Sequence, residues 1–428
     1  MTTETLLERR LRVMGEHAPL FYKEPLHIVR GSGVWLEDSS GRRYLDVYNN
    51  VPHVGHCHPR VVEALCRQAA ILNIHTRYLH ENILEYSERL VATFDPPLTR
   101  ALLCCTGTEA NEAALRIARV NTGGTGILVS DVNYHGNSAS LSEATTAFPT
   151  FEARARGPHV RVIEIPDFRG EPGSAAEREM ADRHVAEVER TLSDMERDGI
   201  RPAALLVDTL FSSEGLRRLP EGYFPRVVEA VRARGGLFIA DEVQAGFGRL
   251  GDHMWGYQAL GVVPDIVTMG KAMGNGHPLA GLVGRADLLD RFAAESMYFN
   301  TFGGNPVSCA VGLAVLDVMR DEKLMENARD VGRYVQQGLK DIAARHPIVG
   351  SVRGRGLYFG LELLHDGDVN RPASMEADKV INLMRDAGVL ISKIGKHSNV
   401  LKMRPPMPFG KEHADILLAA LDRALAQV

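Results

Sequence analysis

The sequence predicts an α/β fold built on a mainly parallel sheet with helices on both faces. Between about residues 61 and 315, short apolar stretches alternate with segments of helical pattern, which is typical of parallel strands joined by crossover helices. The chain has 428 residues, of which 45% are apolar, and this is enough to bury a large core. Together these observations predict one large domain with a smaller one beside it.

The first sixty residues are predicted to form a helix followed by strands. The stretches 28–36 and 44–48 are rich in β-branched and aromatic residues, and glycines provide the turn signals. We expect residues 1–60 to join the smaller domain.

Residues 61–315 are predicted to form the large domain. Its predicted strands are the short apolar stretches 101–104, 127–130, 160–165, 203–207, 237–240, 265–269 and 280–283. The heavily charged segment 175–197 has a helical pattern and is predicted to be a solvent-exposed helix without a role in function.

Residues 316–428 are predicted to complete the smaller domain. Beyond residue 315 the pattern changes to a long helix, then to a single strand over 354–361, and then to further helices up to the end of the chain.

An acid and a lysine stand at the ends of two predicted strands. Asp241 follows the stretch 237–240, and Lys271 comes thirty residues later, just after 265–269. Because the carboxyl ends of parallel strands line the ligand crevice, both side chains can reach one small molecule. An enzyme that uses pyridoxal phosphate needs this pair: the lysine forms a Schiff base and moves a proton, and the carboxylate keeps the pyridine nitrogen protonated. The pair therefore indicates pyridoxal phosphate, with ordinary strand-end residues as the alternative.

Two further segments favour the same cofactor. Residues 105–112, CTGTEANE, connect the strand 101–104 to an amphipathic helix, and a helix that starts with glycine and threonine binds phosphate well. Tyr134 follows the strand 127–130, so that its ring could lie over a flat cofactor; ordinary packing is the alternative for this residue.

With these motifs the chain resembles the class III aminotransferases of pyridoxal phosphate fold type I. The resemblance extends from about residue 20 to residue 425 and rests on successive motifs in the family's order: TGTEANEAALRIAR, NYHG, ADEVQAGFGR, MGKAMGNGHPLAG and FNTFGGNPVSCAVGLAVLDV. It implies an aspartate aminotransferase-like fold, with a mainly parallel seven-stranded sheet in the large domain and a smaller α+β domain formed from both termini. It also implies an enzyme that transfers an amino group from an ω-amine or amino acid to a keto acid.

The resemblance also implies roles for individual residues. Lys271 and Asp241 would be catalytic and would contact the cofactor. The other implied cofactor-binding residues are Gly107 and Thr108 at the phosphate, Tyr134 over the ring, Val243 under it, Gln244 near the ring hydroxyl, His135, Asp208, and Thr301 at the phosphate of the neighbouring subunit's cofactor. The last role implies a homodimer with shared active sites, and a tetramer remains open.

Within the family, the chain is most similar to the branch that contains ethanolamine-phosphate phospho-lyase. The similarity lies in NNVPHVGHCHPRVVEA, RYLHENILEY, TMGKAMGNGHP and NVLKMRPPM. Typical class III aminotransferases grip a substrate carboxylate with an arginine, whereas this chain has Lys402 there and Arg404 two residues later. A lysine is a point charge and not a bidentate fork. Asp208 also replaces the usual glutamate that masks this arginine. The alternative activity is elimination of phosphate and ammonia from O-phosphoethanolamine or a similar phosphorylated amine.

Several polar and basic residues are predicted to border the substrate pocket. They are Tyr22, Lys23, Asn50, His53, Arg77, Lys402 and Arg404. The spacing of His53, His56 and His58 would suit a metal ion, but no second cluster supplies a fourth ligand, so that no metal is predicted.

Composition excludes other classes of function. The net charge of -5 gives no general attraction to nucleic acid or to an anionic membrane. The five cysteines form no regular framework, which favours a reducing compartment. Neither a signal peptide nor a run of 18 apolar residues is found. We therefore expect a cytoplasmic enzyme whose partners are a small-molecule amine and a keto acid.

Overall fold

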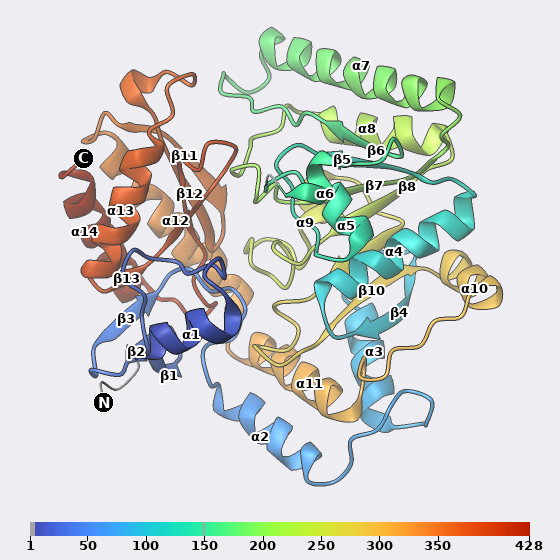
Figure 1. Cartoon of the computed structure of the whole chain (residues 1–428), viewed down its shortest axis with the longest axis horizontal. Helices are drawn as coiled ribbons and strands as arrows, with labels where there is room; N and C mark the ends of the chain where they lie inside the picture. The colour runs from blue at the N-terminus through green and yellow to red at the C-terminus, as the bar shows by residue number, and fades with distance from the viewer. Residues whose placement is uncertain (1–4, 149) are drawn as a thin grey trace.

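The computed structural model describes residues 5–148 and 150–428 (Figure 1). Its largest sheet has the strand order β4 (Leu98–Cys104), β10 (Ala280–Arg285), β9 (Ile266–Met269), β8 (Leu237–Asp241), β7 (Pro202–Asp208), β5 (Gly126–Ser130) and β6 (Val160–Ile163). Strand β10 is antiparallel to both of its neighbours, and all other pairs are parallel. The predicted mainly parallel sheet is confirmed.

Helices cover both faces of this sheet, so its central strands are buried on both sides. On β7, Ala204 and Leu206 pack in the apolar cluster that includes helix α4 (Gly107–Thr122). Leu205 and Val207 point the other way and belong to the cluster that includes α7 (Ala175–Arg197) and α8 (Tyr223–Ala233). Burial on both faces explains why β7 reads as a continuous apolar run in the sequence.

The first part of the chain and a late strand share a second sheet. It has the order β1 (Ile28–Ser32), β2 (Trp35–Asp38), β3 (Arg43–Asp46) and β13 (Val389–Leu390), and β13 runs parallel to β3. Figure 1 accordingly shows the blue N-terminal strands beside the red C-terminal helices. The domain limits at residues 60 and 315 stay a prediction.

The third sheet has the order β11 (Val349–Arg355), β12 (Tyr358–Leu363), β15 (Val400–Met403) and β14 (Ser392–Ile394). The single strand predicted over 354–361 is wrong, because the chain turns back at Gly356 and forms the β11–β12 hairpin. The long helix predicted beyond residue 315 is also wrong. It is two helices, α11 (Pro306–Asp321) and α12 (Leu324–Ala343), which Lys323 separates with a φ of 51°.

The remaining elements are helical. They are α1 (Leu6–Met14), α2 (Pro59–Ala69), α3 (Glu81–Val91), α5 (Ala139–Ala144), α6 (Phe151–Arg154), α9 (Gly256–Leu260), α10 (Ala286–Glu295), the 3-10 turn η1 (His365–Gly367), α13 (Ser374–Asp386) and α14 (Lys411–Leu425). Within the described residues, no helix is long and apolar enough to cross a membrane.

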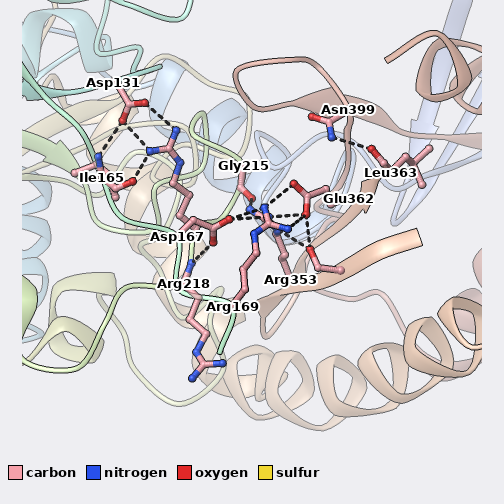
Figure 2. A network of polar contacts seen from close by, with 12 residues as sticks. Asp131, Ile165, Asp167, Arg169, Gly215, Arg218, Arg353, Glu362, Leu363 and Asn399 are labelled. Atoms are coloured by element: carbon pink, nitrogen blue, oxygen red, sulfur yellow. Dashed lines mark hydrogen bonds and ion pairs between the residues drawn. The ribbon is translucent and has the colours of Figure 1, made fainter. Parts of the chain in front are cut away.

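Ion pairs connect the loop after β6 to the third sheet (Figure 2). Arg169 donates from its two terminal nitrogens to the two carboxylate oxygens of Glu362, at 2.7 and 2.9 Å. From the third sheet, Arg353 donates to Asp167 at 2.9 Å and to Glu362 at 2.7 Å. Since such forked, partly buried contacts are strongly directional, they fix this loop against the third sheet.

Gly356 at the hairpin turn should tolerate no side chain. Its φ is +54°, and a Cβ atom there would lie 2.3 Å from the Arg249 carbonyl oxygen. Gly367 has a φ of +69° but only open space around its Cβ position, so it is the matched control. We expect Gly367→Ala to cost about 1–2 kcal/mol from the backbone conformation alone, and Gly356→Ala to cost about 1–3 kcal/mol more from the clash. Thermal denaturation of both variants checks this, and equal losses would contradict it.

Candidate active site

The carboxyl ends of neighbouring parallel strands bring the predicted catalytic residues together. Asp208 ends β7 and Asp241 ends β8, and the two residues are partners in the sheet register. Asp241 is in turn the register partner of Thr268 on β9, the strand that ends two residues before Lys271. Strand β4 ends shortly before the start of α4. These strand ends therefore form one edge of the sheet, as predicted.

Three donors hold the Asp241 carboxylate. Its Oδ2 accepts from Asn111 Nδ2 at 2.9 Å and from His135 Nδ1 at 2.8 Å, and its Oδ1 accepts from the Val243 N–H at 3.1 Å. Asn111 is itself oriented by the Thr268 hydroxyl, which donates to Asn111 Oδ1 at 2.6 Å. These bonds offset the cost of burying the charge and fix the direction of the carboxylate.

Lys271 is half-buried among charged groups. Its amine makes no hydrogen bond or ion pair within the described part of the chain. Burial, together with the positive charge of Arg404, lowers the pKa of Lys271 to about 8, although Asp241 and Asp208 partly oppose this shift. A lysine with this pKa loses its proton far more readily near neutral pH than an ordinary lysine does, which an amine nucleophile or a general base requires.

The start of helix α4 is suited to hold a phosphate. The Thr106 hydroxyl accepts from the Glu109 N–H at 3.1 Å, and Glu109 accepts from the Thr106 N–H at 2.9 Å. This capping box leaves the N–H groups of Gly107 and Thr108 for a ligand. A Cβ atom on Gly107 would lie 3.1 Å from Val243, which is a tight contact, so the helix start comes very close to the Val243 side chain.

The same surface continues to Lys271. A Cβ atom on Gly270 would lie 3.4 Å from the Gly107 nitrogen, which places the helix start next to the residue before Lys271. An unpartnered amine, a fixed carboxylate and free N–H donors therefore surround one place, and these groups fit pyridoxal phosphate. Lys271 would hold its aldehyde carbon, Asp241 its ring nitrogen, and the Gly107 and Thr108 N–H groups its phosphate.

Gln244 joins three parts of the chain beside this place. Its Oε1 accepts from Asn50 Nδ2 at 3.0 Å and also from Arg404 Nη1. The side-chain oxygen of Asn50, Oδ1, is buried and has no partner among the described residues, so it is free to accept from a ligand. The structure thus brings the predicted residues Asn50, Gln244 and Arg404 together.

Two cations lie over the ring of Tyr48. Lys402 Nζ is 5.5 Å and Arg404 Cζ is 4.8 Å from the ring centroid. Burial and the positive charges of Arg404 and Lys271 hold the pKa of Lys402 well below its ordinary value, and the charge of Asp208 partly opposes this. The Lys402 amine therefore lies close to Lys271, in surroundings that disfavour its charged form.

Other predicted residues lie further out in the single chain. Tyr134 is 45% exposed and packs edge-on against Phe148, with ring centroids 5.8 Å apart. Arg77 is exposed, with its guanidinium 3.8 Å from the Phe299 ring centroid. Thr301 and Lys23 are exposed as well. Tyr22 is half-buried, and its hydroxyl donates to the Ile391 carbonyl at 3.1 Å.

The three histidines of the HVGHCHP segment have separate partners. The fully buried His53 has one ring nitrogen 2.8 Å from the Phe247 carbonyl and the other 3.3 Å from Arg249, so nothing here supports it as a substrate contact. His56 pairs with Asp46 at 2.7 Å and His58 with Glu322 at 3.0 Å. Among the described residues these histidines do not converge on a metal ion.

Two residues of the site were missed from the sequence. Asn111 lies within the motif TGTEANEAALRIAR, but the motif does not predict its role in holding Asp241. The signal was a polar residue on the inward face of α4, next to Ala110, Ala113 and Ala114. Tyr48, whose ring lies under Lys402 and Arg404, gives no such signal, because these two partners come from the other end of the chain.

A search of known families matches residues 21–425 to the aminotransferase class-III family. The chain belongs to the class III aminotransferases. It is 38% identical to an alanine–glyoxylate aminotransferase 2-like protein of Drosophila melanogaster, over 100% of this chain and 87% of that protein. It is 35% identical to ethanolamine-phosphate phospho-lyase homolog 1 of Caenorhabditis elegans, over 99% of this chain and 93% of that protein.

Solved structures show the same relationship. A phospholyase from Arthrobacter in complex with phosphoethanolamine is 51% identical, with a TM-score of 0.96 over 99% of this class III chain and 100% of that one. An amine transaminase from an uncultivated Pseudomonas species, in its PLP-bound form, is 28% identical, with a TM-score of 0.85 over 94% and 95% of the two chains. The predicted family, fold type I and cofactor, pyridoxal phosphate, are confirmed. The chain is an enzyme of a family that acts on small-molecule amines.

The buried Lys271 amine should destabilise the cofactor-free protein in a pH-dependent way. Its pKa is about 8 when folded, against 10.5 ordinarily, so that below pH 8 the folded protein carries a poorly solvated charge. We expect Lys271→Met to raise the free energy of unfolding at pH 7 by on the order of 2–3 kcal/mol. The gain should shrink between pH 8 and 10.5, where only the unfolded chain keeps the proton.

Denaturant unfolding of the cofactor-free protein at several pH values measures this gain. Lys340→Met, at an exposed lysine, is the control and should show no such dependence. A Lys271→Met variant that is no more stable than the parent at pH 7 would contradict the prediction.

Proposed function

We propose that this class III enzyme is a phospho-lyase that eliminates phosphate and ammonia from O-phosphoethanolamine or a similar phosphorylated amine. The observation that carries the proposal is Lys402, a half-buried amine near Lys271 at the position where typical class III aminotransferases have a carboxylate-binding arginine. The likeness to the Arthrobacter phospholyase, at 51% identity over 99% of this chain, supports it.

Arg404, the guanidinium beside Lys402, is not a free fork in the described structure. It donates from Nε to the Tyr48 carbonyl at 3.0 Å and from Nη1 to Gln244, so two of its three nitrogens already hold the protein. A carboxylate of an amino acid or keto acid would then meet the point charge of Lys402 and one uncommitted guanidinium nitrogen, which gives less orientation than two parallel hydrogen bonds from a free fork. Binding of a keto acid, which transamination requires, is thus disfavoured.

The Lys402 amine remains available to take up a proton and pair with a substrate anion. Asp208, which replaces the usual glutamate, already uses its carboxylate in hydrogen bonds to the residues that follow it. It accepts from the Leu210 N–H at 2.9 Å, from the Ser212 N–H at 3.2 Å and from the Ser212 hydroxyl. It forms no ion pair with Lys402 in the described structure. A phosphate dianion entering the site would supply the counter-charge that Lys402 lacks, and this would raise its pKa towards the ordinary value.

The proposed chemistry needs a base on this chain to remove the proton from the carbon next to the amine nitrogen. Pyridoxal phosphate, when bound, accepts the electron pair that is left when the C–H bond next to the amine nitrogen breaks. Lys271 is placed to take that proton, and its pKa near 8 suits a general base at neutral pH. If the neighbouring carbon carries phosphate, its C–O bond breaks and phosphate leaves. The carbon that lost phosphate then takes up a proton, and addition of water gives an aldehyde and ammonia, so that O-phosphoethanolamine and water become acetaldehyde, ammonia and phosphate.

Amino-group transfer to a keto acid is the second candidate, and it was the main expectation from the sequence. The relationship to the alanine–glyoxylate aminotransferase 2-like protein, at 38% identity, favours it. The two activities share the role of Lys271 and differ in the need for a keto acid.

We also propose a homodimer with shared active sites. Thr301 is exposed in the single chain, and exposed apolar side chains accompany it: Met297 at 79% and Phe302 at 70%. A partner subunit would cover these side chains and bring Thr301 to the second cofactor. Light scattering after gel filtration tests the assembly.

Release of inorganic phosphate from O-phosphoethanolamine without any keto acid tests the proposed activity. We expect many turnovers in the parent and a loss of at least about 10³-fold in Lys271→Ala, because the general base is gone. Amino transfer that requires a keto acid, with no phosphate released, would make the enzyme an aminotransferase. Full activity in Lys271→Ala would refute the catalytic site itself.

Lys402 should decide between the two substrate classes. We expect Lys402→Met to raise the KM for O-phosphoethanolamine about 10- to 100-fold, because a charge-assisted contact is worth about 1.5–3 kcal/mol. Lys402→Arg should recover part of this affinity and should increase amino transfer from carboxylate-bearing donors. Steady-state kinetics with both kinds of substrate measure the effects, and Lys340→Met serves as the surface control. An unchanged KM in Lys402→Met would rule out contact with the phosphate.

A further inference from the structure

A cluster of possible metal ligands lies on helix α7 and the loop after β6, outside the active site. Glu164 directly follows β6, and His184 and Glu187 are three residues apart on α7. One ligand atom from each of the three residues lies within 4.8 Å of the others. This spacing allows one ion to reach all three after small side-chain movements, since metal bonds to nitrogen and oxygen are about 2.0–2.2 Å.

His184 is prepared to bind a ligand. It is only 6% exposed, and its Nδ1 lies 2.9 Å from the Met180 carbonyl oxygen. Because a carbonyl accepts only from an N–H, the neutral ring carries its proton on Nδ1 and keeps a lone pair on Nε2. Nε2 has no hydrogen-bond partner within the described chain. A ring that donates one N–H to a backbone carbonyl and leaves the other nitrogen free is typical of metal-bound histidines.

A second buried group next to the cluster is unsatisfied. Tyr223 is fully buried, and its hydroxyl has no hydrogen-bond partner in the described structure. Its ring lies edge-on to the His184 ring, with centroids 6.3 Å apart. Burial raises the pKa of this hydroxyl above the ordinary value, and the charges of Asp131, Glu187 and Glu164 add to the shift while Arg217 partly opposes it. A buried O–H without an acceptor indicates that a water or ligand belongs here.

In the described structure only one long ion pair engages the carboxylates of the cluster. Arg217 is committed to Asp131, with contacts of 2.9 and 2.8 Å. Arg190 approaches Glu187 only at 3.9 Å, on the exposed side of the helix. Arg183 lines the same cavity, of about 310 Å³, as Glu164 and His184, but it forms no ion pair with either glutamate.

We propose that Glu164, His184 and Glu187 bind one divalent first-row transition-metal ion, with a water as a further ligand beside the Tyr223 hydroxyl. One imidazole and two carboxylates suit ions such as Zn²⁺ or Mn²⁺. The two glutamate charges balance the ion.

The site would brace the connection between the large sheet and the third sheet. Glu164 is in the same loop as Asp167 and Arg169, which pair with Arg353 and Glu362 (Figure 2). An ion that fixes Glu164 to α7 would therefore hold this loop in the position in which these ion pairs form. The role is structural and requires neither Lys271 nor the bound cofactor.

Titration of the chelator-treated and dialysed holoenzyme with ZnCl2 by calorimetry tests the proposal. We expect one saturable equivalent per chain, a higher thermal midpoint when the ion is bound, and at least a 10-fold weaker affinity in His184→Gln and in Glu187→Gln. MnCl2 in place of ZnCl2 should bind at the same residues, but more weakly.

Two controls keep the result decisive. His159→Gln removes a surface histidine that lies 3.3 Å from Glu143, so it should leave the affinity unchanged. Glu187 is only half-buried, and Glu187→Gln should match the parent's thermal midpoint in chelator, so that weaker binding cannot be due to unfolding. Absence of a saturable equivalent, or affinities in both cluster variants equal to the parent's, would overturn the proposal.

Discussion

The active site depends on burying a carboxylate and an amine close together without letting them pair. Asp241 is satisfied by Asn111, His135 and the Val243 N–H, while no hydrogen bond or ion pair within the described chain holds Lys271. If the two groups formed a direct ion pair, the amine would be held as a cation and could not act as a base. The parallel strands keep the groups apart, because Asp241 pairs in register with Thr268 and Lys271 comes three residues later. The sheet thus sets the protonation chemistry as well as the position of the residues.

The side of the site that we propose for the substrate is assembled from three distant segments. Asn50 and Tyr48 come from the N-terminal part, Gln244 from the large sheet, and Lys402 and Arg404 from the third sheet. Small displacements of the third sheet would move both cations relative to Lys271. The ion pairs from Arg169 and Arg353 across the same junction are therefore part of what keeps the substrate pocket in shape. Substrate preference and domain arrangement cannot vary independently in such a site.

The parts of this structure that the sequence predicted are those governed by local patterns. The seven strands and the pair of Asp241 and Lys271 follow from short apolar runs and from where these runs end. The β11–β12 hairpin was predicted as one strand because the sequence around Gly356 does not show that a turn is needed there. The need for glycine comes from the Arg249 backbone, which packs against Gly356 but lies more than a hundred positions earlier in the chain. In the same way His53 looked like a pocket residue, whereas its two partners, Phe247 and Arg249, come from the large sheet's loops. Contacts of this kind have no signature within a window of sequence.

The pairing of β3 with β13 has a consequence for how the protein is made. Leu45 pairs with Val389, so the neighbouring strand of β3 is synthesised 344 residues (389 minus 45) after it. During translation the large sheet has all of its strands long before this partner leaves the ribosome, and closing so long a loop has a high entropic cost. A nascent or C-terminally shortened chain exposes β3 as an open strand edge, the type of surface that recruits other chains. The open edge of β3 is thus closed only after the segment that contains β13 has been synthesised.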